Sequence, residues 1–353
     1  MLLDWVSLYL PRGSEPAWIR AQWDRWGDRL CRYCPRTGTV RWESAAWDSV
    51  RSDSHQIAVQ ITGDTVRLQG SPARLWGDGD NTFPACEGSA SVAASAERMI
   101  RAAADLAGVW LPHDRGLWHV TRVDVTRNFL LPSAADVRAA LGFLRGTEGG
   151  RYRVSATAGE TVYWGGKSRL RRAKAYLKGA QLRAWVAGFE KRREVCPVQY
   201  APAVLDAADR LLRLELTLGA QWWRERAPCT WQEMGPEVLG EQWESFFGRM
   251  VGARCEATML DQGLGLLSTF EAVAPTAARG RAAFRTWQVI KATGWEHARA
   301  SMPKATWYKH LTIMRAAGLG DADLSAGHVI PLRRRPVEMV AVGSWAQVLA
   351  RAA

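Results

Sequence analysis

The stretch Arg213-Leu-Glu215-Leu-Thr217 alternates polar residues with leucine, and Arg122-Val-Asp124-Val-Thr126 repeats the pattern earlier in the chain with valine. Successive side chains of a β-strand point to opposite faces of a sheet. Each stretch therefore predicts a strand with one aliphatic face and one face that carries an arginine, a carboxylate and a threonine. In a common sheet, the two strands would display both carboxylates on a single surface.

A third stretch, Ser168-Arg-Leu-Arg-Arg-Ala-Lys-Ala-Tyr-Leu-Lys178, places a tyrosine among five lysines and arginines. As a strand over residues 170–178, followed by a helix, it would put Lys174, Tyr176 and Lys178 on one face. We favour this strand. The same residues also fit a helix, in which Tyr176 and Lys178 would point apart.

These residue types together suit phosphodiester chemistry. A tyrosine hydroxyl titrates at about pH 10 and is a weak nucleophile unless cations or a metal ion stabilise its phenolate. Two carboxylates with free coordination positions suit Mg²⁺ or Mn²⁺, which prefer oxygen ligands. We therefore expect Asp124 and Glu215 to bind Mg²⁺ (or Mn²⁺), with Tyr176 attacking the polarised phosphate in line. Lys174 or Lys178 would neutralise the developing charge.

Arginines would complete this surface by orienting the carboxylates or by holding phosphates. The predicted DNA-binding residues are Arg74, Arg122, Arg169, Arg171, Arg172, Arg213, Lys304 and Lys309. The alternative is a set of amphipathic surface strands whose charges are solvated. Periodicity alone leaves that alternative open.

The composition favours a nucleic-acid partner. The 353 residues carry a formal net charge of +12, and the sequence pI is about 9.8. Such a charge favours nucleic acid before a membrane surface, because phosphate contacts supply a large share of the affinity of basic proteins for DNA. No apolar run is long enough for a membrane span and no signal peptide is evident. Cys31 and Cys34 lack the second ligand pair of a zinc site. We expect a cytoplasmic protein.

The chain length allows two domains. Strand and helix patterns alternate over residues 1–230, where we expect an α+β domain built on an antiparallel sheet. Helical patterns prevail over 231–353, where we expect a smaller, mostly helical domain. Other predicted elements are a hairpin around Gly63-Asp64, a loop over 71–81, and helices over 17–32, 89–106, 134–145, 236–251, 277–293 and 304–317.

Several short blocks keep a characteristic order along the chain. They are Ser71-Pro-Ala-Arg74, Thr121-Arg-Val-Asp124, Thr161-Val-Tyr-Trp164, Ala175-Tyr-Leu-Lys178, Leu212-Arg-Leu-Glu215, Ser301-Met-Pro-Lys304, Ala316-Ala-Gly-Leu319 and His328-Val-Ile-Pro-Leu332. In this order they resemble the filamentous-phage replication initiators of the gene II/X type. The resemblance covers residues 70–335.

The resemblance implies a rolling-circle endonuclease related to the HUH endonucleases, whose core is an antiparallel sheet with flanking helices. Such a protein nicks one strand of supercoiled phage DNA at the origin. It stays attached through a 5′-phosphotyrosine, here at Tyr176, and later reseals the displaced strand. The implied partners in the host cytoplasm are origin DNA, supercoiled or displaced as a single strand, and the host helicase and polymerase.

The chain departs from that pattern at the expected metal site. No His-hydrophobe-His motif is present, and by strand parity His119 lies on the face opposite Asp124. Gln181 stands where the family usually has a glutamate. Either Gln181 or His119 remains open as a third metal ligand.

The C-terminal part offers a second route to DNA. Residues 281–293, a turn at Gly294 and residues 304–317 predict a helix-turn-helix-like unit whose second helix carries Lys304, Lys309 and His310. A small helical bundle with ordinary surface lysines is the alternative. For the whole chain, the competing interpretation is a sequence-specific DNA-binding protein that never cuts, such as a repressor or replication accessory. A tyrosine recombinase is disfavoured, since no pattern of arginine and histidine precedes a late tyrosine.

Overall fold

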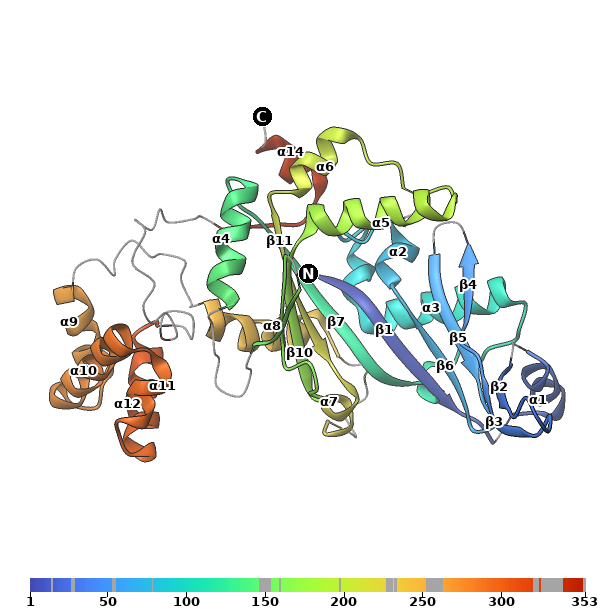
Figure 1. The fold of residues 1–353 in the computed structure, drawn as a ribbon, viewed down its shortest axis with the longest axis horizontal. Helices are drawn as coiled ribbons and strands as arrows, with labels where there is room; N and C mark the ends of the chain where they lie inside the picture. Colours follow the sequence, from blue (N-terminus) through green and yellow to red (C-terminus); the bar gives the residue numbers. More distant parts are fainter. Residues whose placement is uncertain are drawn as a thin grey trace.

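The computed structural model of the chain describes residues 1–353 except 14, 27–28, 53–54, 78, 146–153, 159, 197, 227–230, 232–233, 252–262, 320–323, 325–338 and 352–353. A twisted sheet forms its centre, helices cover one face of the sheet, and a further group of helices follows it (Figure 1). Among the described residues, no helix combines the length and the apolar content that crossing a bilayer requires.

The main sheet is antiparallel at every described strand pairing. Its spatial order is β4 (Asp48–Ser52), β5 (His55–Ile61), β6 (Thr65–Gly70), β1 (Leu2–Pro11), β7 (His119–Leu130), β11 (Leu211–Leu218), β10 (Arg171–Leu177), β9 (Thr161–Trp164) and β8 (Val154–Ala158). A separate two-stranded sheet consists of β2 (Arg29–Tyr33) and β3 (Val40–Ala45).

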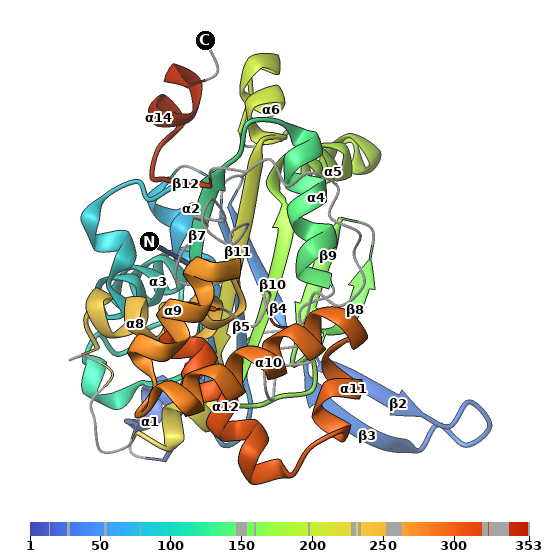
Figure 2. The same cartoon turned by 90° about the vertical axis from the view of Figure 1, so that its left-hand side faces the viewer.

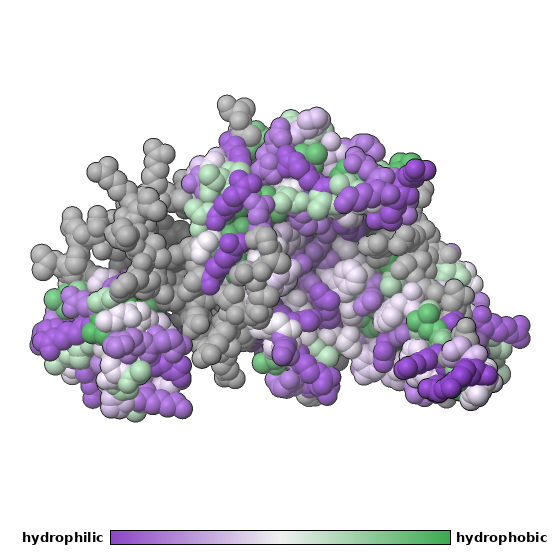
Figure 3. All heavy atoms as spheres, in the orientation of Figure 1, coloured by the Kyte–Doolittle hydropathy of each residue, from purple (hydrophilic) through white to green (hydrophobic). Residues whose placement is uncertain are grey.

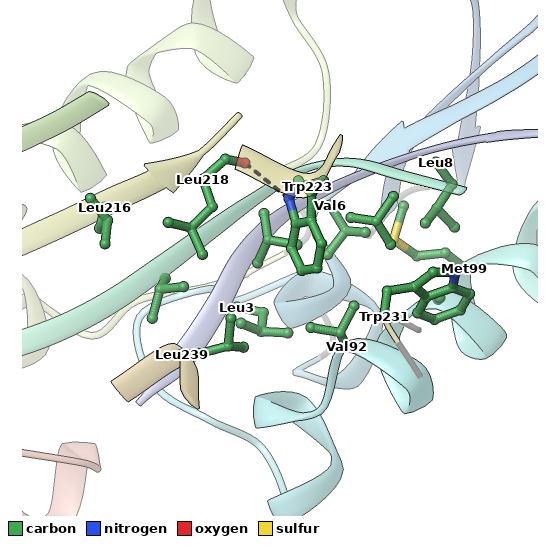
Figure 4. Packing of buried hydrophobic residues seen from close by; sticks show 14 of the residues in the cluster. Leu3, Val6, Leu8, Val92, Met99, Leu216, Leu218, Trp223, Trp231 and Leu239 are labelled. Atoms are coloured by element: carbon green, nitrogen blue, oxygen red, sulfur yellow. Dashed lines mark hydrogen bonds between the residues drawn. The ribbon is translucent and has the colours of Figure 1, made fainter. Parts of the chain in front are cut away.

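One face of the main sheet is aliphatic and packs against α3 (Val92–Ala107), α4 (Ala134–Arg145) and α8 (Pro236–Val251). Each fully buried leucine or valine contributes about 1.5–3 kcal/mol relative to an exposed one. Figure 4 shows part of this core, with contributions from Leu3, Val6, Leu8, Leu216, Leu218, Val92, Met99 and Leu239. Arg213 and Glu215 alternate with these leucines and so project from the opposite, polar face.

Other helices lie around the edges of the sheet and along its polar face. They are α1 (Ala17–Asp24), α2 (Pro72–Trp76), α5 (Lys178–Arg192), α6 (Pro202–Ala208), α7 (Ala220–Arg224) and α14 (Trp345–Ala350). In Figure 2, α3 and α8 lie on one side of the sheet, and the β2–β3 hairpin projects on the other.

The C-terminal helices have a hydrophobic cluster of their own. They are α9 (Gly263–Val273), α10 (Ala277–Thr293), α11 (Trp295–Ala300) and α12 (Lys304–Ala316), and Phe270, Phe284 and Trp307 lie in their cluster. Helix α8, by contrast, contributes Trp243 and Phe247 to the core of the main sheet. The division of the chain into 1–230 and 231–353 stays a prediction.

The chain then returns to the main sheet. Strand β12 (Val340–Val342) pairs with residues 128–130 of β7. Because β11 occupies the other edge of β7, β12 extends the edge on which β1 lies. Helix α14 follows directly and lies beside α6 (Figure 1).

Three predicted elements differ from the structure. The helix expected over 17–32 ends at Asp24, before Gly27, a poor helix former, and the chain continues as β2. The loop expected over 71–81 contains the short helix α2, which has a proline at its first position. Strand β10 ends at Leu177, and α5 begins at Lys178.

Candidate active site

Tyr176 and Glu215 lie on the polar face of two paired strands. In the register of β10 and β11, Lys174 pairs with Glu215, and Tyr176 pairs with Arg213. Residues opposite each other in an antiparallel pair project from the same face. The Tyr176 hydroxyl donates a hydrogen bond to Glu215 Oε1. The structure thus brings the predicted tyrosine, lysine and carboxylate together.

Glu215 is surrounded by cations. Arg213 Nε donates to Glu215 Oε1 at 3.1 Å, and Lys174 Nζ lies 2.7 Å from Oε2. The Lys174 ammonium also lies 5.2 Å from the centre of the Tyr176 ring. The side chains of Arg213 and Glu215 are buried, whereas that of Lys174 is 35% exposed. Lys174 is therefore the one of these three side chains that reaches solvent.

Tyr176 holds its proton firmly. Burial, and next the negative charge of Glu215, raise the pKa of Tyr176 well above its usual value. The residue is 7% exposed and borders a pocket of about 380 Å³. The other residues around this pocket include Asp4, Asn81, Lys174 and Gln181. At neutral pH the phenol is therefore protonated, and Glu215 is the carboxylate in contact with it.

Asp4 is a third carboxylate at this site, and sequence analysis missed it. A register shift in β1 between Leu3 and Trp5 interrupts the strand alternation there. Asp4 Oδ1 lies 3.2 Å from Arg213 Nη2 and accepts a hydrogen bond from Asn81 Nδ2 at 2.7 Å. Burial opposes its ionisation, but Arg213 and nearby lysines outweigh burial and lower the pKa of Asp4 to about 2. The available signal was a lone aspartate inside an apolar strand.

Lys178 is fully buried in the first turn of α5. Its ammonium donates to Asn81 Oδ1 at 3.0 Å and to Gln181 Oε1 at 2.9 Å. Burial, followed by repulsion from Arg213, lowers the pKa of Lys178 well below its usual value. Lys178 therefore ties the loop that carries Asn81 to α5. Gln181, which replaces the expected glutamate, serves as its acceptor.

Asp124 is paired with its neighbour on the same strand. Arg122 Nε and Nη2 donate to the two Asp124 oxygens at 2.9 and 2.6 Å. In the sheet register Asp124 pairs with Thr217, and Glu215 pairs with Thr126. The two carboxylates are therefore diagonal neighbours, whose backbones lie roughly 7–8 Å apart.

These contacts bear on the predicted metal ion. Arg122 engages both oxygens of Asp124, while Tyr176, Arg213 and Lys174 surround those of Glu215. Within the described part of the chain, no group of three or more histidine, cysteine, aspartate and glutamate side chains has the arrangement of a metal site. In this arrangement arginine and lysine side chains, rather than a metal ion, neutralise the two carboxylates. Binding of Mg²⁺ or Mn²⁺ by Asp124 and Glu215 stays a prediction.

His119 lies too far from Asp124 for the two side chains to bind the same metal ion. The two residues are five positions apart on β7, which corresponds to about 16 Å, and the His119 ring stacks on Tyr9 with centroids 4.7 Å apart. The parity argument that placed His119 on the opposite face was wrong. Val120 and Val123 both lie in the core because a bulge intervenes, and it brings His119 to the polar face.

A basic groove lies on the same polar face. It has a volume of about 630 Å³, and Figure 3 shows hydrophilic residues over the middle of this face, below α5. The residues that give the basic groove its character are Arg67, Arg122, Lys167, Arg169, Arg172 and the half-exposed Trp47. Three predicted DNA-binding residues, Arg122, Arg169 and Arg172, therefore line one groove.

Three other predicted DNA-binding arginines have internal roles. Arg171 reaches α8 on the aliphatic side of the sheet, where it donates to Gln242 at 2.8 Å. Arg74 lies over the ring of Trp185, with 4.4 Å between the guanidinium and the ring centre. Arg213 is fully buried. Each of these three arginines therefore contacts other residues of the same chain.

The two predicted lysines on α12 are exposed. They belong to the C-terminal helices, where α11 occupies the place expected for a turn at Gly294. His310 faces inward, with Nδ1 2.8 Å from Thr286 Oγ1 of α10. Lys304 and Lys309 are therefore available to DNA, whereas His310 packs between helices. Residues 328–332, which form the last of the sequence blocks named above, lie outside the described residues.

The fold and the site define a class: an antiparallel α+β protein whose open face carries a tyrosine–carboxylate pair beside an arginine-lined groove. The model of the Phage CRI family, which describes the N-terminal part of a phage replication-associated protein, matches residues 4–239, and the chain belongs to that family. The predicted resemblance to gene II-type initiators is thereby confirmed. The predicted fold class, a sheet with flanking helices followed by a helical C-terminal region, is confirmed by the strand pairings and helices.

One relative is the replication-associated protein of Enterobacteria phage I2-2. It is 27% identical to this chain over 235 residues, a match that spans 62% of this chain and 62% of the relative's length. Among solved structures, one similar chain is the rolling circle replication initiator protein from Geobacillus stearothermophilus. The alignment covers 62% of this chain and 73% of the initiator chain. That alignment has a TM-score of 0.28 and 11% sequence identity.

Proposed function

We propose that this chain nicks one strand of origin DNA and becomes attached to the new 5′ end through Tyr176. The observation that carries the proposal is the hydrogen bond from the Tyr176 hydroxyl to Glu215, beside Lys174. A nucleophile, a proton acceptor and a cation that reaches solvent are the groups that transfer of a phosphodiester needs. Membership of a replication-associated family supports DNA as the substrate.

In the proposed step, the Tyr176 oxygen forms a bond to phosphorus while the bond between phosphorus and the 3′ oxygen of the preceding nucleotide breaks. Glu215 accepts the phenolic proton, and the departing 3′ oxygen takes a proton from solvent. One phosphoester replaces another, so the reaction needs no energy source. A 3′ hydroxyl reverses the step by attacking the phosphotyrosine, which reseals the strand.

The cations around this pair have separate tasks in the proposal. Lys174 neutralises the charge that develops on the phosphate oxygens, since it is the neighbour of Tyr176 that extends toward solvent. Arg169 and Arg172 hold flanking phosphates in the basic groove. Lys178, which is buried, keeps the Asn81 loop in place and has no contact with the phosphate in this proposal.

A nick followed by one resealing event per round would make this chain an initiator of rolling-circle replication. It would act on supercoiled phage DNA in the host cytoplasm. A host helicase and polymerase would extend the free 3′ hydroxyl and displace the old strand.

The test uses a supercoiled plasmid that carries the origin of the replicon encoding this chain. Wild-type protein with Mg²⁺ should yield open circles, and denaturation should leave protein attached to a 5′ end. Tyr176→Phe keeps the ring but removes the nucleophile, so it should yield neither product. Equal nicking by both proteins would exclude Tyr176 as the nucleophile.

The second candidate is a protein that binds the origin and never cuts. It is favoured by the low exposure of Tyr176, which is 7%. Under this alternative, wild type and Tyr176→Phe bind the origin equally and neither forms a covalent complex with any origin fragment. The same plasmid assay therefore separates the two candidates.

A further inference from the structure

The β2–β3 hairpin takes no part in the proposed cleavage step. Among the described strands its two members pair only with each other, and the hairpin extends away from the main sheet on the side opposite α3 and α8 (Figure 2). Leu30, Val40 and Trp42 on this ribbon are each more than half exposed, at 55%, 56% and 54%. Such a concentration of exposed apolar side chains on one short element marks an interaction surface.

The hairpin is also strongly basic. Residues 29–45 contain four arginines and a single acid, Glu43. All four arginine side chains are exposed, and Arg29 lies 4.0 Å from Glu43. The ribbon therefore keeps a net charge of +3. An exposed apolar surface with this charge fits a polyanion better than it fits an ordinary protein partner.

The shape of the hairpin suits a duplex. A two-stranded ribbon fits the major groove of B-DNA, which is about 12 Å wide. Arg32 lies directly opposite Trp42, so these two side chains share one face of the ribbon. Arg29 is three residues from Arg32 on the same strand and points to the other face. Positive charge on both faces matches the phosphates on both walls of a duplex groove.

The base of the hairpin is joined to the basic groove. Gln60 Nε2 donates to the Ala45 carbonyl at the end of β3, at 2.8 Å. Gln60 Oε1 in turn accepts from Arg67 Nη1 at 3.5 Å. Arg67 lines the basic groove together with Trp47, which follows the hairpin by two residues. DNA held by the hairpin would therefore continue into the basic groove, whose Arg172 lies on the same face of β10 as Lys174 and Tyr176.

We propose that the β2–β3 hairpin binds the duplex DNA that flanks the strand cut by Tyr176. This inference rests on the proposed function for its choice of DNA as the partner. The exposed arginines contact phosphates, and Trp42 packs its ring against the floor or the wall of the groove. The hairpin then holds the duplex, while the basic groove holds the strand to be cut.

The test removes three hairpin charges in the full chain, with the variant Arg32→Ala/Arg36→Ala/Arg41→Ala. Binding is measured in EDTA by fluorescence anisotropy, on a duplex of random sequence and on a single strand of equal length. Each lost phosphate contact lowers the slope of log affinity against log salt by about 0.9 for a duplex. We expect the duplex slope to fall by about 2–3 and the affinity to fall at least tenfold, with a smaller loss on the single strand.

The matched control is Arg101→Ala/Arg138→Ala/Arg192→Ala, which removes the same charge from helices α3, α4 and α5. Its duplex affinity should fall much less. A second hairpin variant, Trp42→Ala, keeps the charge and should also weaken duplex binding. Circular dichroism confirms folding of each variant, and none of the substituted residues lies in the hydrophobic core.

A hairpin variant whose loss does not exceed that of the control would overturn the proposal. Equal losses on duplex and single strand would also overturn it, in favour of a single-strand contact. Because binding is measured without cleavage, this result is independent of the Tyr176→Phe experiment. Failure of the hairpin proposal and failure of the cleavage proposal are therefore distinguishable.

Discussion

The indole nitrogen of Trp345 donates to Asp80 Oδ2 at 2.9 Å, across 265 positions of the chain. Asp80 also accepts from the Tyr200 hydroxyl at 2.8 Å. The next residue, Asn81, is the acceptor for Lys178 and the donor to Asp4. The C-terminal segment thus supports the loop that shapes the candidate active site.

The first prediction concerns this support. Trp345→Phe keeps a ring against Phe83 and Tyr200 but removes the N–H donor. Loss of a hydrogen bond to a charged group should lower the free energy of unfolding by about 1.5–3 kcal/mol. Urea unfolding would measure it. The control Trp18→Phe, at a 61% exposed site, should change stability by no more than about 0.5 kcal/mol.

The second prediction concerns the proton acceptor. Glu215→Gln keeps the shape of the side chain but cannot take the Tyr176 proton. The single-turnover rate of cleavage should fall by about 10²–10⁴-fold, the usual contribution of a general base. The surface variant Glu160→Gln, which breaks an exposed pair with Arg138, should cleave like wild type. Wild-type cleavage by Glu215→Gln, in a protein that is folded by circular dichroism, would remove Glu215 from this role.

Much of the sheet could be predicted from the sequence because one of its faces is buried. Burial of one face forces the period-two pattern around Arg213 and Arg122, and both stretches are strands as expected. The β2–β3 hairpin was missed for the opposite reason. Its described side chains other than Ala45 are exposed or half-buried, so Arg29–Tyr33 shows no aliphatic alternation and was assigned to the preceding helix.

The site was only partly predictable for a related reason. Strand parity brought Lys174, Tyr176 and Glu215 to one face, and the register confirms that they share it. Strand parity does not predict which cation pairs with which carboxylate. It also fails where the register of a strand shifts, as it does at Asp4. The pairing of Asp124 with Arg122 depends on side-chain geometry that no pattern encodes.

The third prediction concerns the pH dependence of stability. The pKa of Asp4 is lowered from 3.8 in the unfolded chain to about 2 in the folded protein. Its ionised form therefore stabilises the fold above pH 3.8, and this stability is lost as the pH falls through about 2. The shift corresponds to about 2 kcal/mol.

Urea unfolding between about pH 5 and about pH 2 would measure this effect. Wild type should lose about 2 kcal/mol more than Asp4→Asn over this range. The control Asp206→Asn replaces a carboxylate whose side chain is 77% exposed. Its pH dependence should follow wild type. Parallel curves for wild type and Asp4→Asn would contradict the assigned role of Arg213 and the lysines.

The last prediction concerns the C-terminal helices. Lys304 and Lys309 are exposed on α12, and the half-exposed Tyr308 lies between them in sequence. If α12 contacts duplex DNA, Lys304→Ala/Lys309→Ala should reduce the slope of log affinity against log salt by about 2, because two phosphate contacts are lost. The matched variant Arg279→Ala/Arg285→Ala removes two charges from α10 of the same helical cluster and should reduce it less. Equal slopes for the α12 variant and wild type would leave the C-terminal helices as a bundle with ordinary surface lysines, and duplex binding would then depend on the β2–β3 hairpin.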